Sequence, residues 1–216
     1  MEAAATIVLS IAVLVGLSYF LILNKPPSHR RAFWKTLPVS LLALYALVME
    51  APHLMVAGLA LSALGDAFLA YEGERNFIGG LASFLLAHLA YGALFYQIGD
   101  VGLVTAEAWR MVAAVVAVLL AGALVGFLWR AAGELAPAVL AYASAIAGMA
   151  VLSLGVSSVA VFAGALLFMS SDAVLAVETF KMTKDHPLRR LAARYVWASY
   201  FGSQVVLTLS VVAIAS

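Results

Sequence analysis

Two aspartates lie inside apolar stretches that are long enough to cross a lipid bilayer. Asp66 lies in the sequence LSALGDAFLA (61–70), and Asp172 lies in LFMSSDAVLA (167–176). A carboxylate near the centre of a membrane helix costs at least about 2.5–3.5 kcal/mol, so such residues are rare and usually functional. Two carboxylates in one apolar site can divide the roles of general acid and general base. We therefore treat them as a candidate acid–base pair.

The composition is that of a polytopic membrane protein. Hydrophobic residues make up 65% of the 216 residues and charged residues only 11%, whereas soluble domains are about a quarter charged. The mean hydropathy is +1.07. The absence of cysteine excludes disulfides and thiolate ligands, and a net charge of +1 argues against a nucleic-acid partner.

Eight apolar segments predict an all-α fold, a bundle of about eight transmembrane helices. Each segment is much longer than the ~10-residue alternating strands of a membrane barrel. The first lacks the basic start of a signal peptide, so we expect it to be retained. We expect a single transmembrane domain over residues 1–216. The segments are 4–23, 36–50, 53–71, 77–98, 108–130, 135–152, 156–180 and 191–214.

The basic residues predict the orientation of the helices. Of twelve lysines and arginines, all but Arg110 lie at or near the connections after the first, third, fifth and seventh segments. Cytoplasmic loops of membrane proteins are enriched in these residues. We therefore expect this side to be cytoplasmic and both termini to face away from it, in what we expect to be a bacterial inner membrane.

The two halves of the chain look like a duplication, with possible repeats at 1–100 and 108–216. Each aspartate follows a glycine, Gly58 or Gly164, by eight residues, and each precedes Ala-x-Leu-Ala and a glutamate. Four crossings in each repeat would give both the same orientation. The alternative is chance similarity between helices rich in alanine and leucine.

Helical spacing places further polar residues near the candidate acid–base pair. Ser62 lies four residues before Asp66, so it shares that face of the helix and could hydrogen-bond the carboxylate. His88, three residues before Tyr91, is either a proton-transfer residue or a neutral hydrogen-bonding residue. Both readings place it near the middle of the membrane.

Other polar residues fit either substrate binding or a structural role. Lys35 and Arg194 lie at segment ends, where basic residues usually anchor a helix at the interface, although they could also hold a lipid phosphate. Three of the tyrosines within the segments suit packing as well as substrate contact, namely Tyr45, Tyr142 and Tyr200. Tyr200 shares a polar stripe with Gln204.

The sequence gives little support for metal catalysis, and we predict no cofactor. His29 and His186 lie in predicted cytoplasmic connections, and His53 lies on the opposite side. Only His88 and the two aspartates could converge, and zinc sites normally use more histidine or cysteine than that.

The order and spacing of these motifs resemble the YhhN-like family of integral membrane lysoplasmalogenases. The resemblance extends over essentially the whole chain. The motifs that carry it are Lys35-Thr36-Leu37-Pro38, Ser62-x-x-Gly65-Asp66-x-x-Leu69, Phe77-x-x-Gly80-x-x-x-Phe84-x-x-x-His88-x-x-Tyr91, Ser171-Asp172-x-x-Leu175-Ala176-x-x-x-Phe180, and Tyr200 with Gln204.

The resemblance implies hydrolysis of the vinyl-ether bond of lysoplasmalogens, which yields a fatty aldehyde and glycerophosphoethanolamine or glycerophosphocholine. Asp66 and Asp172 would be the acid–base pair, by a logic that parallels glycosidase carboxylates, and His88 would assist. The residues expected to bind or orient the lysophospholipid are Lys35, Tyr45, Ser62, Tyr91, Tyr142, Ser171, Arg194, Tyr200 and Gln204.

Two other functions fit the same residues. Duplicated halves with intramembrane carboxylates also describe proton-coupled carriers of small molecules or lipids. Against a carrier, no pair of helices broken by glycine or proline occupies matching positions, and both aspartates are predicted near one face of the membrane. A hydrolase of a different lysolipid would share the site without requiring a vinyl ether.

Overall fold

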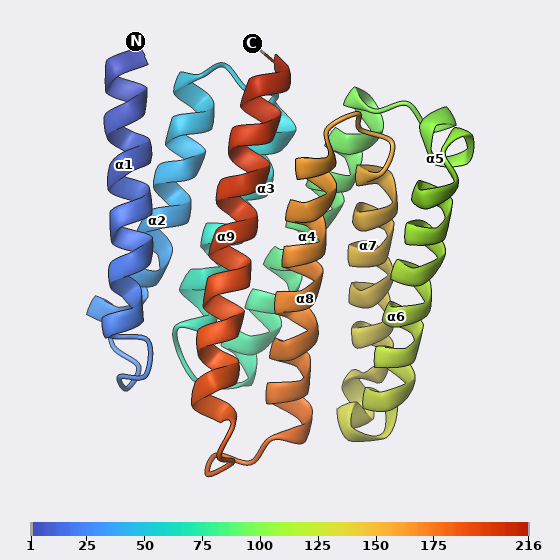
Figure 1. Ribbon diagram of the computed structural model, residues 1–216. Helices are drawn as coiled ribbons and strands as arrows, with labels where there is room; N and C mark the ends of the chain where they lie inside the picture. Colours follow the sequence, from blue (N-terminus) through green and yellow to red (C-terminus); the bar gives the residue numbers. More distant parts are fainter. Residues whose placement is uncertain (1, 216) are drawn as a thin grey trace. The chain divides into compact units, whose positions relative to one another are not determined.

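The computed structural model describes residues 2–215, which form helices joined by short connections (Figure 1). This part of the chain contains no strand, which confirms the predicted all-α fold. Its long helices are α1 (Glu2–Ser18), α2 (His29–Val48), α3 (His53–Leu69), α4 (Glu74–Ile98), α6 (Ala108–Ala132), α7 (Ala136–Ser153), α8 (Val159–Lys181) and α9 (Arg189–Ala215). The short elements are α5 (Gly102–Ala106) and two 3-10 turns, η1 (Tyr19–Leu21) and η2 (Gly133–Leu135).

The helices are those of an integral membrane bundle. Within residues 2–215, six stretches are long and apolar enough to cross a membrane, and one of them is the 46-residue run Ala108–Ser153. That run folds back at η2, where Gly133 has a φ of +55°, and its helices α6 and α7 pack side by side. It therefore supplies two crossings. The 17-residue α3 is apolar but shorter than the others.

The chain divides into two compact units, which we describe separately. The described part of unit 1 comprises residues 2–91 and 204–215, and unit 2 comprises residues 92–203. Helices α4 and α9 each contribute residues to both units. The predicted repeats at 1–100 and 108–216 concern sequence similarity rather than packing, so the duplication stays a prediction.

Helix α2 begins at His29, not at residue 36 as the apolar pattern predicted. Its N-cap is Ser28, whose side chain accepts a hydrogen bond of 3.2 Å from the backbone N–H of Arg31. The first two turns were missed because they are polar. Residues 29–35, which were expected in a connection, are therefore helical. Within them, Arg31 lies one turn before Lys35 on the same face of α2.

Helices α3 and α4 of unit 1 approach closely because glycines on one helix face bulky side chains on the other. Three pairs show this, with the distance from an added Cβ to the facing side chain in parentheses: Gly58 and Tyr91 (2.6 Å), Gly65 and Phe84 (2.6 Å), and Gly80 and Leu69 (2.5 Å). The two residue numbers total 149 in every pair, which is the signature of antiparallel helices in one register. Small residues permit such close packing in membranes.

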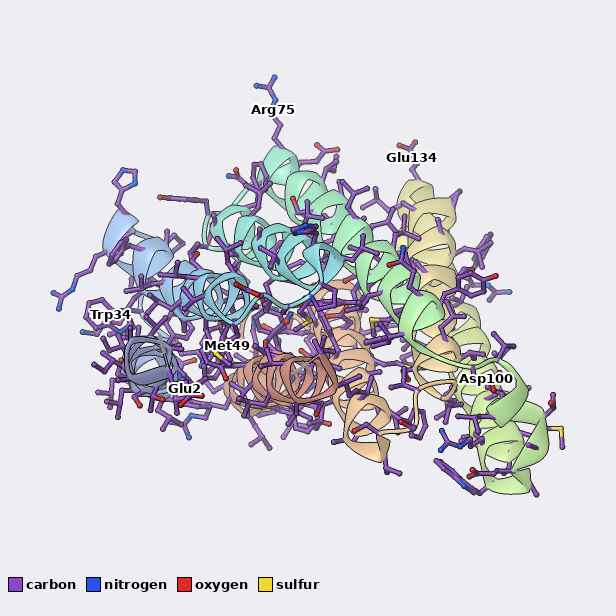
Figure 2. All side chains as sticks on the ribbon, turned by 90° about the horizontal axis from the view of Figure 1, so that it is seen from above. Glu2, Trp34, Met49, Arg75, Asp100 and Glu134 are labelled. Atoms are coloured by element: carbon purple, nitrogen blue, oxygen red, sulfur yellow. The ribbon has the colours of Figure 1, made fainter. Side chains whose placement is uncertain are left out.

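In each unit, basic residues from different connections lie together at one end, and Arg110 of unit 2 is the exception among residues 2–215. In unit 1, Nδ1 of His29 hydrogen-bonds the Tyr71 hydroxyl at 2.7 Å, which brings the α1–α2 and α3–α4 connections together. Arg75, at the start of α4, extends away from the ribbon there (Figure 2). In unit 2, Nζ of Lys181 lies 4.6 Å from the ring centroid of Phe127, which joins the ends of α8 and α6. Basic connections assigned to one side of the membrane therefore lie together within each unit.

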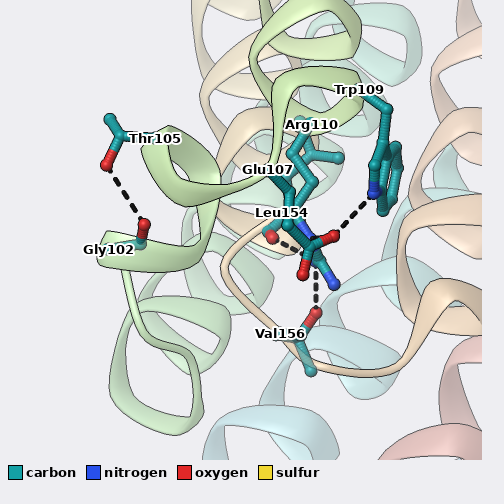
Figure 3. A network of polar contacts seen from close by, with 7 residues as sticks. All are labelled: Gly102, Thr105, Glu107, Trp109, Arg110, Leu154 and Val156. Atoms are coloured by element: carbon teal, nitrogen blue, oxygen red, sulfur yellow. Dashed lines mark hydrogen bonds and ion pairs between the residues drawn. The ribbon is translucent and has the colours of Figure 1, made fainter.

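Arg110, the single basic residue predicted on the opposite side, is buried in a polar network of unit 2 (Figure 3). Its Nη1 donates to the carbonyls of Leu154 and Val156 at 2.5 and 2.9 Å. Its Nε lies 3.0 Å from Oε2 of Glu107, and its guanidinium lies 4.7 Å from the ring centroid of Trp109. Arg110 therefore fastens the α7–α8 connection to the start of α6.

Glu107 makes this network sensitive to acid. Hydrogen bonds from Arg110 and then from Trp109 hold the pKa of the exposed Glu107 below its ordinary value of 4.5. A carboxyl whose pKa is lower in the folded state stabilises the fold above its unfolded pKa, and this contribution disappears as pH falls through the folded pKa. At neutral pH we expect the solubilised wild type to melt at a higher temperature than Glu107→Gln. This difference should decrease as the pH falls below 4.5 and should disappear once Glu107 is protonated in the folded state. A difference independent of pH would contradict this account.

Replacing Gly65 by alanine is expected to destabilise unit 1, because the new Cβ would meet the buried Phe84 ring at 2.6 Å. Overpacking of this kind typically costs about 1–3 kcal/mol. The matched control is Gly122→Ala in α6, where an added Cβ meets nothing within 4 Å. That change should be neutral or stabilise by about 0.5–1 kcal/mol, since alanine favours helix. The melting temperatures of the two variants are compared in the same detergent. Equal melting temperatures would contradict the register of α3 against α4.

Candidate functional site

Asp66 of α3 and Lys35 of α2 form a buried ion pair in unit 1. Oδ1 of Asp66 lies 3.2 Å from Nζ of Lys35, and the two side chains are 1% and 16% exposed. Removing a carboxylate from water costs free energy unless a partner compensates, and the ammonium group provides that compensation. From the sequence, Asp66 was predicted to act in catalysis and Lys35, separately, to bind phosphate. The structure places the two next to each other.

Tyr19, which was not among the predicted site residues, connects this ion pair to Arg31. Tyr19 of η1 is buried, hydrogen-bonds Arg31 and interacts electrostatically with Asp66. Nη1 of Arg31 donates to the Ala70 carbonyl at 3.4 Å, whereas its buried Nε has no hydrogen-bond partner within residues 2–215. A buried donor without a partner costs about 1–3 kcal/mol, and more when charged. The i, i+4 spacing of Arg31 and Lys35 was the signal in the sequence.

A second buried network in unit 1 joins three helices. The Tyr91 hydroxyl donates to Oε1 of Gln204 at 2.6 Å, and Nε2 of Gln204 donates to Oγ of Ser62 at 3.1 Å. All three side chains are fully buried, and both ends of the amide group are satisfied. Because Ser62 lies one turn before Asp66, the network fixes the turn of α3 that precedes the carboxylate. The predicted hydrogen bond between Ser62 and Asp66 stays a prediction.

His88 and Tyr45 belong to the same unit as Asp66 and are buried. The register of α3 and α4 places Asp66 level with Ser83, five residues before His88. At 1.5 Å per residue, His88 lies about 7 Å further along the helix axis than Asp66. The catalytic role of His88 stays a prediction. So does substrate contact by Tyr45.

Asp172 of α8 is held by a hydrogen bond within unit 2. The hydroxyl of Tyr142, from the neighbouring α7, donates to Oδ2 of Asp172 at 2.6 Å, the length of a strong phenol–carboxyl bond. Both residues were predicted from the sequence to belong to the site. Their hydrogen bond was not predicted, because they lie on different helices, 30 residues apart in the chain. The phenol fixes the orientation of the carboxyl group.

Unit 2 contains three further residues that were predicted to bind the substrate, namely Ser171, Tyr200 and Arg194. The Ser171 hydroxyl donates to the Val196 carbonyl at 3.0 Å, which ties α8 to α9. The buried Tyr200 ring lies edge-on to Phe168, with 5.4 Å between centroids. Arg194 is exposed on α9. Two of these residues thus have structural contacts, and their predicted substrate contacts stay predictions.

The two aspartates lie at different distances from the ends of their helices. Asp66 lies three residues before Leu69, the last residue of α3, and Asp172 lies nine residues before Lys181, the last residue of α8. Their pairing as acid and base stays a prediction.

No group of three or more His, Asp and Glu side chains within residues 2–215 is arranged to hold a metal ion.

Removing Lys35 while keeping Asp66 is expected to destabilise the protein by about 3–5 kcal/mol, because a buried carboxylate would lose its cation. Lys35→Met should show this loss, and the double variant Lys35→Met with Asp66→Asn should recover most of it. Unfolding in detergent measures both, with Arg30→Met, at an exposed position of the same helix, as the charge-matched control. A double variant no more stable than Lys35→Met would contradict the ion pair.

Known proteins place the chain in a family. The family model of the YhhN family matches residues 30–211. The protein named lysoplasmalogenase TMEM86A from Bos taurus is 26% identical over 208 residues, a match that covers 88% of this chain and 81% of that protein. No solved structure matches. Because the family match runs from the first turn of α2 into the last turns of α9 and includes every candidate residue from Lys35 to Gln204, the chain belongs to the YhhN family.

Proposed function

We propose that this membrane protein hydrolyses the vinyl-ether bond of lysoplasmalogens. Membership of the YhhN family and the similarity to a bovine lysoplasmalogenase support this reaction. The observation that carries the proposal is the buried Asp66 carboxylate, paired with Lys35 inside an apolar bundle. Such a group stabilises positive charge where water is scarce, and the cleavage of a vinyl ether develops positive charge.

The reaction needs one proton donor and one carboxylate. A carboxylic acid protonates the β-carbon of the vinyl ether, and the double-bond electrons form the new C–H bond. The resulting oxocarbenium ion accepts water at the α-carbon, and a carboxylate takes the proton that this water releases. The hemiacetal then collapses to a fatty aldehyde and the free hydroxyl of the glycerophospho compound. No covalent intermediate with the enzyme is required.

The contacts of the two aspartates support a division of these roles. The ammonium group of Lys35, 3.2 Å from Asp66, stabilises negative charge there, which suits the carboxylate that faces the oxocarbenium ion. We assign the proton-donor role to Asp172, which the Tyr142 hydroxyl orients through Oδ2. We also propose that the basic ends of both units face the cytoplasm of a bacterial inner membrane, in keeping with the positive-inside rule.

Asparagine at either aspartate is expected to abolish most of the activity. Aldehyde release from lysoplasmalogen by detergent-purified protein should fall by roughly 10²–10⁴-fold in Asp66→Asn and in Asp172→Asn, since general acid–base groups contribute on that order. Activity of the wild type should persist with a chelator. Tyr142→Phe should show a smaller loss, mainly in kcat, because the carboxyl group remains but is less well oriented.

The control is Asp185→Asn, which removes a carboxylate from the exposed α8–α9 connection. It should retain wild-type turnover. Wild-type turnover by Asp66→Asn would exclude the proposed mechanism. A folded wild type that releases no aldehyde would exclude this substrate, and uptake assays in sealed vesicles together with a panel of other lysolipids would then separate a carrier from a different hydrolase.

A further inference from the structure

We propose that Arg31 and Lys35 together bind the phosphodiester of the lysophospholipid headgroup, an inference that rests on the proposed function. Arg31 was expected in a connection between helices, and only its placement in α2 makes it part of a site. The ligand is identified by its chemistry, as the monoanionic phosphodiester of a glycerophospholipid.

Arg31 has a hydrogen-bond donor that finds no acceptor among residues 2–215. Its contacts are a long hydrogen bond of 3.4 Å from Nη1 to the Ala70 carbonyl and a hydrogen bond with the Tyr19 hydroxyl. Its Nε is buried and has no partner among the described residues. Guanidinium groups bind phosphate through two parallel N–H groups, and Nε with a neighbouring Nη is such a pair. An acceptor from outside the chain would satisfy it.

Lys35 places a second positive charge close to this donor of Arg31. One helical turn separates Arg31 from Lys35, which is about 6 Å along the axis of α2, and both lie on the same face. Lys35 remains 16% exposed while it contacts Asp66. Two cations therefore follow each other along α2. Arg31 contacts the start of the α3–α4 connection at Ala70, and Lys35 contacts the buried carboxylate of Asp66.

The order of groups in the substrate agrees with this order of residues. In a lysoplasmalogen the phosphate and the vinyl-ether oxygen are attached to opposite ends of the three-carbon glycerol. A phosphate held between Arg31 and Lys35 would leave the glycerol beside Lys35 and bring the vinyl ether to Asp66, which Lys35 contacts. Arg194, the arginine that the sequence predicted to bind phosphate, instead lies at an exposed position of unit 2.

The test compares a substrate that carries the phosphate with one that lacks it. Aldehyde release is measured from 1-O-alkenyl-lysophosphoethanolamine and from 1-O-alkenylglycerol, and the ratio of their kcat/KM values is the readout. We expect Arg31→Gln to lower this ratio by roughly 10- to 100-fold, mainly through KM, as one charged hydrogen bond implies. Arg30→Gln removes the same charge from the neighbouring exposed residue and should change the ratio by no more than about twofold.

A binding measurement separates this inference from the proposed reaction. A saturated 1-O-alkyl-lysophosphoethanolamine has the headgroup but no vinyl ether, and titration calorimetry measures its binding without turnover. Wild type and Arg30→Gln should bind it with similar affinity, and Arg31→Gln should bind it at least tenfold more weakly. If this pattern appears while the wild type releases no aldehyde, the phosphate site stands and the proposed reaction fails.

Equal losses on both substrates in Arg31→Gln would overturn the inference, because they would show a structural role or a bound bilayer lipid that does not turn over. If Arg31→Gln does not fold, Arg31→Lys decides, since it keeps the charge but lacks the paired N–H groups. An unchanged substrate ratio in Arg31→Lys would likewise overturn the inference.

Discussion

The buried ion pair between Lys35 and Asp66 is the constraint on which unit 1 depends. An apolar bundle offers few ways to keep a carboxylate charged, and a cation at 3.2 Å is the most direct of them. The pair fixes α2 against α3, and the neighbouring Tyr19 brings η1 to the same place. Position and charge of the carboxylate are therefore set by three elements rather than by α3 alone.

Different contacts hold α3 against α4. Glycines at its contacts with α4 let a tyrosine and a phenylalanine ring reach the backbone, and the hydrogen bonds among Ser62, Gln204 and Tyr91 fasten the same surface. Packing of this kind leaves the helix no freedom to rotate. In a reaction that depends on where a carboxylate faces, rigidity of the supporting helix is part of the chemistry.

The sequence predicted the fold well, because apolar length is a direct physical requirement of a membrane span. The prediction of helix bounds failed where a helix begins with polar residues. The start of α2 was missed since its first two turns carry arginines, and this concealed the spacing of Arg31 and Lys35. The pairing of Tyr142 with Asp172 was also missed, because it depends on which faces of α7 and α8 meet, and apolar segments do not encode this.

Two buried or half-buried arginines show how structural and functional charges can be told apart. Arg110 uses Nη1 on two carbonyls and Nε on Glu107, so its burial is compensated by contacts within the protein. Arg31 has a buried Nε that finds no hydrogen-bond partner among residues 2–215. Natural proteins rarely retain a buried polar group without a hydrogen-bond partner. An anionic ligand beside Lys35 would supply that partner, and the lysophospholipid that we propose as substrate carries such an anion.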